Sequence, residues 1–361
     1  MVGNDFLYAA QICSFFPKKI YLCLAKCGRG RMGYSLDDIR AAIELALQAL
    51  VHQQAPEDLY SPIWYTLQSG GKRIRPSLCI SVADWLSEAP IALQDVMPVA
   101  IAIEIFHNFT LLHDDVMDVS ALRRGRTTVW KRWNVNTAIL SGDAMNILAY
   151  EQLAKAPQAQ LPELLKCFND GAMRVCMGQQ WDMEFEQSPL VTEQQYLEMI
   201  AHKTSALLEM SARLGFLFAS PKHREIEDAI IQFAREIGLA FQLQDDYLDV
   251  YGDSNEFGKE CGDDIVTNKQ TYLSVLLQTR ASANQLEQFN TYKELGSLQR
   301  ADKIRKVMAL YDELRICSVC ETAIKTHLDA AERHLAQCEK TIGRVSPALR
   351  AIFMSLRGRR F

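Results

Sequence analysis

Two acidic segments of the sequence have residue types and a spacing that suit cation binding. Each carries aspartates at positions i, i+1 and i+4, which are Asp114, Asp115 and Asp118 in the first set and Asp245, Asp246 and Asp249 in the second. On a helix the first and last aspartates of a set share one face, where like charges cost about a few tenths of a kcal/mol. Neither set has a lysine or arginine within one turn on that face. Carboxylate oxygens suit Mg²⁺, which proteins often share with substrate phosphates, so the two sets predict magnesium sites.

Helical geometry extends each set into a longer stripe. His107 and Thr110 fall on the face of the first set, and Gly238 and Gln242 fall on the face of the second. A single D-D-x-x-D segment is often only a solvated helix end. Two copies, each at the end of an apolar helix, favour a functional site instead. If the two helices face each other, four or more carboxylates meet across a groove.

Basic residues gather near both acidic sets. Residues 70–76 read G-G-K-R-I-R-P and bring Lys72, Arg73 and Arg75 to a predicted helix N-terminus, where free amide groups favour an anion. The other cations follow the acidic sets or lie at a predicted helix break, and they are Arg123, Arg124, Lys203, Lys259 and Lys269. One such cluster is usually solvated surface. Several clusters beside two acidic sets predict a site for two multiply charged phosphate groups.

Helices must position these side chains, because helical periodicity dominates from Ser35 onward. The clearest predicted helices are 36–52, 57–68, 93–119, 136–154, 161–186 and 223–250. A helix capped by Thr192 is expected to bend near Thr204 and run on to Phe218, and 271–356 reads as shorter amphipathic helices. No segment alternates convincingly as a strand, and no hairpin turn is expected. The sequence predicts an all-α fold, a single large helical bundle with its most apolar helices central.

Composition fits an ordinary globular protein. The chain has 361 residues, of which 48% are hydrophobic and 23% charged, and its net charge of −5 argues against a general nucleic-acid surface. No apolar run reaches the ~18 residues of a membrane span. Ten cysteines without zinc-like spacing predict reduced thiols and a cytoplasmic location.

The N-terminal stretch differs from the rest. Residues 1–31 are rich in aromatic residues and cysteine, and their basic residues follow the apolar part instead of preceding it as in a signal peptide. Met32 is followed by a normal helix start. We therefore expect 1–31 to be an extension outside the core, and 32–361 to form the functional domain.

These motifs together resemble the isoprenyl diphosphate synthases, the trans-prenyltransferases of the polyprenyl synthetase family. The resemblance covers most of the chain from about Tyr34 onward. Its specific segments are G-G-K-R-x-R-P, D-D-x-x-D followed by L-R-R-G, K-T, and F-Q-x-x-D-D-x-x-D ahead of G-K and N-K, all in the expected order. It implies the isoprenoid synthase fold with a central active-site cavity, a homodimer, and condensation of isopentenyl diphosphate with allylic diphosphates to short-chain (C15–C20) all-trans products.

The resemblance also implies roles for individual residues. Asp114 and Asp118 would bridge two Mg²⁺ ions on the allylic diphosphate and Asp245 would take a third, with Asp115, Asp246 and Asp249 in support. The allylic diphosphate would be held by Arg123, Lys203, Thr204, Gln242, Lys259 and Lys269. Isopentenyl diphosphate would be held by Lys72, Arg75, His107 and Arg124.

Product length in this family depends on the residues four and five places before the first acidic set, which are Thr110 and Phe109. Farnesyl-making enzymes of the animal type have aromatic residues at both places, and this chain has one. The first motif also lacks the two-residue insertion of many bacterial enzymes. This pattern resembles archaeal-type geranylgeranyl enzymes, so C20 is favoured, with C15 next. The alternative is that Phe109 only packs in the core.

Other functions remain to be weighed. A class I terpene cyclase shares the first motif but lacks the G-G-K-R-x-R-P segment, and a non-catalytic subunit of a heteromeric synthase would be expected to lose carboxylates. Glu104 and His107 have the i, i+3 spacing of a di-iron helical bundle, yet no second such pair occurs. A satisfied core histidine is the other alternative for His107.

Overall fold

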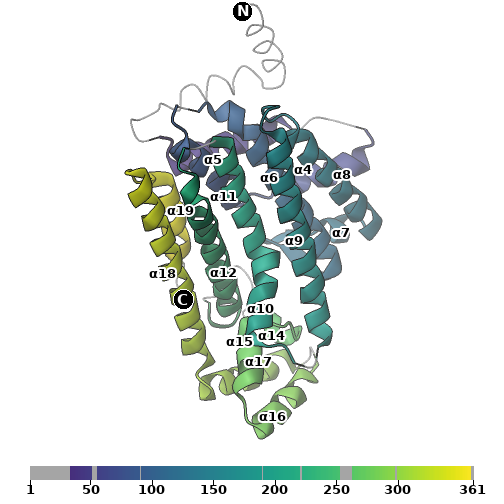
Figure 1. Ribbon diagram of the computed structural model, residues 1–361. Coiled ribbons are helices and arrows are strands. Elements are labelled where there is room, and N and C mark those ends of the chain that lie inside the picture. Colours follow the sequence, from purple (N-terminus) through teal and green to yellow (C-terminus); the bar gives the residue numbers. More distant parts are fainter. Residues whose placement is uncertain are drawn as a thin grey trace, which may run out of the picture. The chain divides into compact units, whose positions relative to one another are not determined.

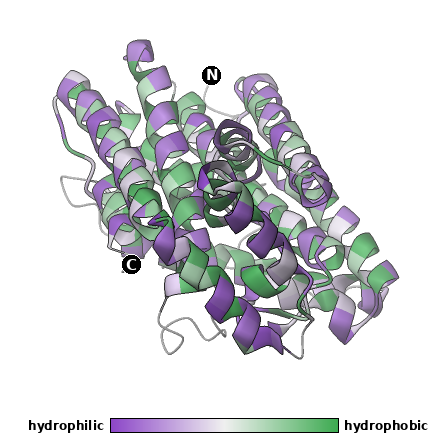
Figure 2. Ribbon diagram, turned by 90° about the horizontal axis from the view of Figure 1, so that it is seen from below, coloured by the Kyte–Doolittle hydropathy of each residue, from purple (hydrophilic) through white to green (hydrophobic). Residues whose placement is uncertain are grey.

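The computed structural model confirms the predicted all-α fold (Figure 1). It describes residues 33–50, 55–89, 91–188, 190–219, 222–252, 262–296 and 299–358. The extension 1–31 and Lys259 lie outside the described residues. Most helices carry hydrophilic and hydrophobic residues on different sides (Figure 2), as expected for elements that pack around apolar cores.

By the packing of its residues the chain divides into two compact units. The first contains the chain up to Phe168 together with Ser211–Arg224 and Ile342–Ile352. Its main elements are α3 (Leu36–Ala49), α4 (Glu57–Leu67), α5 (Ile74–Leu86), α6 (Leu93–Met117), β1 (Leu122–Arg123), β2 (Arg126–Thr127), α7 (Val129–Arg132) and α8 (Val135–Leu153). Helix α6 packs against α3, α4, α5, α7 and α8, so it forms the core of this unit.

The burial of α6 explains its composition. Every residue from Val96 to Asn108 is buried. By length and composition alone α6 is apolar enough to cross a membrane, but 72% of its most apolar window is buried inside the protein. A core helix covered on all sides has the same all-round hydrophobicity.

The second unit contains Asn169–Met210, Glu225–Thr341 and the chain from Phe353 onward. Its elements are α10 (Glu193–Ile200), the π-helix η1 (Ala201–Ser205), η2 (Arg224–Ile226), α12 (Glu227–Tyr251), α14 (Asp263–Val266), α15 (Tyr272–Arg280), α16 (Ala283–Lys293), α17 (Arg300–Glu313) and α18 (Ile316–Ile342). Helices α9 (Leu161–Gln187), α11 (Ala206–Ala219) and α19 (Pro347–Arg357) contribute several residues to each unit, and the end residues Arg224 of η2 and Ile342 of α18 belong to the first unit. Helix α12 packs against η1, α10, α14 and α15.

Local capping signals in the sequence predicted helix starts correctly. The Ser35 side chain accepts a hydrogen bond from the Asp38 amide and begins α3. Thr192 and Gln195 form both bonds of a capping box at the start of α10. Near Thr204, where a bend was expected, the structure has the π-helix η1, in which the hydrogen-bonding pattern widens locally.

Two expectations were wrong. Strands β1 and β2 form a two-residue hairpin, paired Leu122 with Thr127 and Arg123 with Arg126. Its turn residues Arg124 and Gly125 both have positive φ (52° and 72°). Hairpin turns of this kind usually have glycine, asparagine or aspartate at the first position, so an arginine there gave no signal from which to predict the turn.

The C-terminal region also differs from expectation, because α18 spans 27 residues instead of a short helix. Its buried residues recur every three or four positions, from Cys320 to Cys338. All cysteines among the described residues are free thiols, including Cys317 and Cys320, which form a C-x-x-C pair on this helix. Burial raises the pKa of the Cys338 thiol to about 12.

Candidate active site

The first acidic set lies at the C-terminal end of α6. Asp114 and Asp115 belong to its last turn, and Asp118 is the capping residue that ends it. This last turn contains no basic residue. The C-terminus of a helix carries the negative end of its dipole, where cations are favourable. Three carboxylates at that position therefore create a strongly negative helix end that a bound cation would stabilise.

The β1–β2 hairpin that follows α6 places the Arg123 side chain beside this acidic set. Arg123 Nε donates to Asp115 Oδ1 at 2.6 Å, and its Nη2 lies 3.5 Å from Asp114 Oδ2. Burial raises the pKa of Asp115 to about 6, although the Arg123 guanidinium acts in the opposite direction. The β1–β2 hairpin is thus the element that places Arg123 beside the two adjacent carboxylates.

The same hairpin connects to the glycine-rich segment before α5. Arg124 Nη1 donates to the carbonyl oxygen of Gly70 and lies 3.5 Å from the Ser69 hydroxyl. A Cβ atom on Gly71 would lie 2.9 Å from that same nitrogen, and Gly71 has φ of 139°. The positive φ favours glycine at this position, because a side chain would strain the backbone there. The structure therefore brings together two basic segments through a contact between residues 54 positions apart in the sequence.

Arg73, one of the three cations in that segment, is part of the core. It caps α5 in a left-handed conformation, and its side chain is 1% exposed. Its guanidinium pairs with Glu104 at 2.6 Å and Glu44 at 2.7 Å, and donates to the Leu67 carbonyl oxygen at 2.8 Å. The charge of Arg73 is thereby neutralised inside the protein. It holds the segment in place, whereas the side chains of Lys72 and Arg75 are more exposed.

His107 is kept neutral by its surroundings. Burial, followed by the charge of Arg75, lowers its pKa well below the ordinary value for histidine. Its Nε2 atom lies 3.1 Å from Arg75 Nη1 and must accept this bond, because a guanidinium only donates. The Glu104 carboxylate accepts bonds from Arg73 and from the Asn108 side chain, so Glu104 serves an internal network in the described structure.

Phe109 and Thr110 lie one turn before the first acidic set. The Thr110 hydroxyl donates to the His107 carbonyl oxygen at 2.8 Å. The half-buried Phe109 ring packs edge-on against His113, with centroids 4.7 Å apart, and lies 5.4 Å from the Phe106 ring. His113 fills the space above Gly142, where a Cβ would come within 2.2 Å of its ring. This packing fixes the orientation of Phe109, and the sequence did not reveal it.

The second acidic set occupies the last two turns of α12, which also lack a basic residue in the final turn. Asp246 is buried and receives three hydrogen bonds from neutral donors. Tyr196 donates its hydroxyl at 2.5 Å, Tyr272 its backbone amide at 2.9 Å, and Gln242 its Nε2 at 3.0 Å. Burial raises the pKa of Asp246 to about 7, and these hydrogen bonds oppose the shift. Asp245 lies half-buried beside it.

The π-helix η1 supplies the next two predicted residues. Lys203 Nζ donates to Asp182 Oδ2 on α9 at 2.6 Å, and the Thr204 hydroxyl donates to Gln242 Oε1 at 2.8 Å. Small residues allow η1 to lie close to its neighbours. A Cβ on Gly178 of α9 would come within 2.2 Å of the Lys203 amide nitrogen. Thr204, Gln242 and Asp246 therefore form one continuous hydrogen-bonded chain.

The segment after α12 folds back onto the last aspartate of the second set. The Asp264 amide donates to Asp249 Oδ2 at 3.0 Å, and the Gly262 amide donates to the Asp249 carbonyl oxygen. The Lys269 amide in turn donates to the Asp264 carbonyl oxygen at 3.0 Å. Lys269 thus lies on a turn that Asp249 anchors.

Comparison with known proteins decides the family. A family model described as polyprenyl synthetase matches residues 56–314, more than half of the chain. The chain belongs to the polyprenyl synthetase family.

Its relatives within this family include proteins with assigned products. The short chain isoprenyl diphosphate synthase of Methanothermobacter thermautotrophicus is 32% identical over 323 residues, which cover 88% of this chain and 97% of that protein. The geranylgeranyl diphosphate synthase of Methanosarcina mazei is 36% identical over 236 residues, or 64% of this chain and 71% of that protein. The crystal structure of a geranylgeranyl pyrophosphate synthetase from Pyrococcus horikoshii superposes with a TM-score of 0.81 at 27% identity, covering 95% of this chain and all of that one.

The donor atoms of this polyprenyl synthetase suit Mg²⁺. The candidate ligands Asp114, Asp118, Asp245 and Asp249 offer hard carboxylate oxygens at two helix C-termini. Within the described part of the chain, no three His, Cys, Asp or Glu side chains already converge as a metal site. Such a donor set fits Mg²⁺, because this ion keeps several waters and takes further ligands from substrate phosphates.

Sequence reasoning missed the residues that support the site. Asp182 orients Lys203, and Tyr196 together with the backbone of Tyr272 orients Asp246. None of them lies in the acidic and basic segments on which the prediction was based, and each acts across at least 21 positions of the sequence. The sequence motifs therefore point to the candidate substrate-binding residues, and the structure identifies the neighbouring residues that orient them.

Proposed function

We propose that this protein is a Mg²⁺-dependent short-chain trans-prenyltransferase that condenses isopentenyl diphosphate with allylic diphosphates. The main support for the proposal is the pair of acidic sets at the C-termini of α6 and α12. Arg123 pairs with the first set, and the second set is hydrogen-bonded through Gln242 to Thr204, the residue next to Lys203. Carboxylates at the negative end of a helix, without basic residues in the last turn, are costly unless cations bind there. Membership of the polyprenyl synthetase family supports the same reaction.

In this proposal both acidic sets act on the allylic diphosphate. Asp114 and Asp118 would hold two Mg²⁺ ions and Asp245, supported by Asp249 as a further candidate ligand, a third, while Asp115 and Asp246 keep the ligands in place. Bound Mg²⁺ would neutralise the diphosphate and stabilise the charge that develops as the allylic C–O bond breaks. Asp115 and Asp246 suit a supporting role, since each is buried and already hydrogen-bonded.

The cationic residues would divide between the two diphosphates. Allylic diphosphate would be held by Arg123, Lys203, Thr204, Gln242, Lys259 and Lys269. Isopentenyl diphosphate would be held by Lys72, Arg75, His107 and Arg124. Arg124 joins the β1–β2 hairpin to the glycine-rich segment and Arg75 contacts His107, so these residues can act as a group. Because His107 is neutral, it would contribute a hydrogen bond and not a charge.

The Thr204–Gln242–Asp246 chain suits stabilisation of an allylic carbocation. Asp246 fixes the Gln242 amide, and Gln242 Oε1 accepts the Thr204 hydroxyl hydrogen. The Thr204 oxygen therefore keeps its lone pairs available as the negative end of a fixed dipole. Dipoles oriented in advance need no rearrangement when charge develops. No side chain in these motifs is an obvious dedicated base, so we propose that the released diphosphate takes the final proton.

For the product we propose geranylgeranyl diphosphate (C20), with farnesyl diphosphate (C15) next, and Phe109 as the floor of the chain-binding site. Phe109→Ala should lengthen the products, because the ring that His113 supports would be missing. Mass analysis of dephosphorylated products measures this. Phe289→Ala is the matched control, since it removes an equally large buried ring from α16. An unchanged product profile in Phe109→Ala would reject the floor role.

We further propose that residues 32–361 form one synthase domain, that two copies pair as a homodimer, and that the protein is cytoplasmic. The α8 residues Val135, Ile139, Leu140 and Ile147 are each at least 40% exposed. Apolar residues gathered on one helix are favourable when a second subunit covers them. Free thiols throughout the described residues support a reducing compartment.

The direct test incubates purified protein with Mg²⁺, labelled isopentenyl diphosphate and each allylic primer in turn. The expected result is primer-dependent incorporation, with C20 as the main dephosphorylated product. Incorporation that needs no allylic primer, or none with any primer, would contradict the proposal. A cyclic hydrocarbon as product would instead indicate the terpene cyclase.

A further inference from the structure

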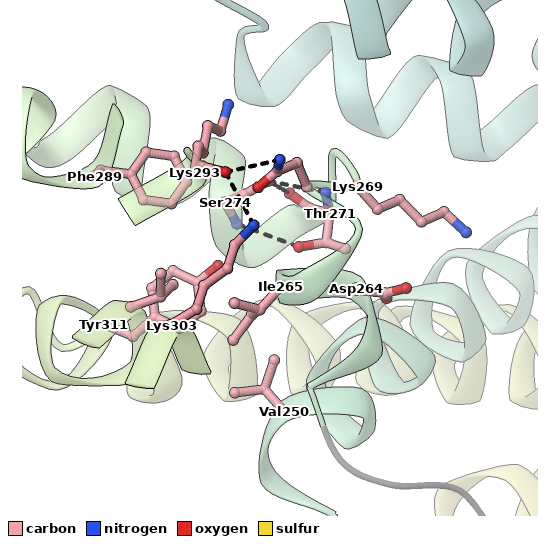
Figure 3. Close-up of a pocket in the computed structure, with 12 residues that line it drawn as sticks. Val250, Asp264, Ile265, Lys269, Thr271, Ser274, Phe289, Lys293, Lys303 and Tyr311 are labelled. Atoms are coloured by element: carbon pink, nitrogen blue, oxygen red, sulfur yellow. Dashed lines mark hydrogen bonds between the residues drawn. The ribbon is translucent and has the colours of Figure 1, made fainter. Parts of the chain in front are cut away.

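Lys303 on α17 is a buried lysine that none of the family motifs contains. The residue is 2% exposed. Its ammonium donates to the carbonyl oxygens of Val266 and Lys293, each at 3.1 Å. These are the last residues of α14 and α16, where carbonyl groups lack partners within the helix. Figure 3 shows the Lys303 side chain reaching the Lys293 carbonyl from inside a small pocket also lined by Ile265, Phe289 and Tyr311.

This arrangement is costly for a lysine. Burial, followed by the charge of Lys293, lowers the pKa of Lys303. No carboxylate in the described part of the chain forms an ion pair with it. A buried ammonium without such a partner is usually worse for stability than an apolar side chain of similar size. The two carbonyl contacts therefore indicate that Lys303 fixes the geometry of the segments that carry them.

The segment held by Lys303 is the one that presents Lys269. The Asn268 side chain donates to the same Lys293 carbonyl oxygen at 3.2 Å, and Asn268 has a left-handed backbone with φ of 59°. At the other end of this turn, the Asp264 amide is bound to Asp249. Figure 3 shows the Lys269 and Asp264 side chains extending away from the Lys303 ammonium. The turn is therefore fixed at one end by the second acidic set and at the other by Lys303.

We propose that Lys303 is a positioning residue that orients Lys269 toward the allylic diphosphate, an inference that rests on the proposed function of Lys269. The Val266 carbonyl lies three residues before Lys269, so a shift of α14 moves the Lys269 backbone directly. Lys303 itself stays buried and does not touch substrate.

The test compares Lys303→Met with Lys306→Met, a matched control on the same helix whose ammonium pairs with Asp302 at a more exposed position. Lys303→Met should raise KM for the allylic diphosphate about 10-fold, within the range expected for residues that orient a ligand-binding group. KM for isopentenyl diphosphate should stay within about 2-fold, because a general loss of packing would affect both substrates. Lys306→Met should leave both values unchanged.

A double-mutant cycle with Lys269→Ala separates positioning from a structural role. If Lys303 acts through Lys269, adding Lys303→Met to Lys269→Ala should change KM for the allylic diphosphate by less than about 2-fold. Should Lys303→Met not fold, Asn268→Gly replaces it in the cycle, since glycine keeps the left-handed backbone while removing a donor to the Lys293 carbonyl.

The two possible failures are distinguishable. Additive effects of the two substitutions, or equal changes in KM for both substrates, would overturn the positioning role and leave the proposed function of Lys269 intact. If Lys269→Ala alone leaves KM for the allylic diphosphate unchanged, the proposed function of Lys269 fails and the inference about Lys303 fails with it.

Discussion

The two acidic sets have the same D-D-x-x-D pattern but are stabilised in different ways. In the first set, the buried middle residue Asp115 is held by the Arg123 guanidinium, and burial raises its pKa to about 6. In the second, the buried middle residue Asp246 is held by the hydroxyl of Tyr196, an amide side chain and a backbone amide, all neutral, and burial raises its pKa to about 7. The middle aspartate of the motif is therefore held by a cation in one unit and by neutral donors in the other.

This difference indicates a division of labour. At the first set, the Arg123 guanidinium partly balances the charge of Asp114 and Asp115. In the proposed function, Arg123, Arg124 and Arg75 would also bind diphosphate oxygens. At the second set, the hydrogen bonds that hold Asp246 also orient Gln242 and Thr204. Removing the residue that binds the middle aspartate should therefore lower turnover more at the first set than at the second.

Removing the cation at the first set should have the larger effect. Arg123→Leu leaves Asp115 buried without its partner and removes a proposed diphosphate contact, so turnover should fall by about 100- to 1,000-fold. Steady-state kinetics measures this. Arg126→Leu is the control, because Arg126 lies in the same hairpin with its guanidinium over the Tyr65 ring. Near-normal turnover in Arg123→Leu would remove the distinction between the two sets.

Removing one neutral donor at the second set should cost less. Tyr196→Phe leaves two of the three hydrogen bonds to Asp246, so we expect about 10-fold lower turnover and about 1–2 kcal/mol lower free energy of unfolding. Tyr272→Phe is a matched control, since Tyr272 serves Asp246 through its backbone amide and its hydroxyl donates to Glu193. A larger effect from Tyr196→Phe than from Arg123→Leu would reverse the comparison.

The smallest expected effect is a pH dependence of the unfolding free energy. It would show that the surroundings of His107, near the first set, are cationic. Burial and the arginines lower the pKa of His107, so the folded protein keeps it neutral while the unfolded chain takes up a proton below about pH 6.5. Its contribution to stability is therefore present above that pH and is lost as pH falls, by up to about 1.4 kcal/mol per pH unit.

His107→Gln lacks this dependence. Urea unfolding of both proteins across this pH range should show the wild type losing stability relative to the variant as pH decreases. Parallel curves would mean that His107 is protonated in the folded state and that its surroundings are not strongly cationic.

The elements that the sequence predicted correctly are those with local signals. Ser35 and Thr192 cap their helices within four residues, and the continuous apolar run of α6 reflects burial on all sides. The acidic sets and the basic segments could likewise be read from spacing and from the family resemblance.

Features that depend on long-range contacts could not be predicted. Arg73 looks like a surface cation in the sequence, but Glu104, 31 residues away, draws it into the core. Asp182 lies outside the segments used for the prediction, and it meets Lys203 because Gly178 allows η1 to approach α9. The hairpin that places Arg123 beside the first acidic set contains Arg124 at a turn position with positive φ, where the sequence gives no turn signal.

The central claim is that both acidic sets bind Mg²⁺ on the same allylic diphosphate. Calorimetric titration of an unreactive allylic diphosphate analogue tests it, with and without Mg²⁺, for the wild type, Asp114→Ala and Asp245→Ala. Binding to the wild type should require Mg²⁺, and each substitution should weaken it by about 10-fold or more while circular dichroism shows an intact fold. Mg²⁺-independent binding, or wild-type affinity in Asp245→Ala, would contradict the account.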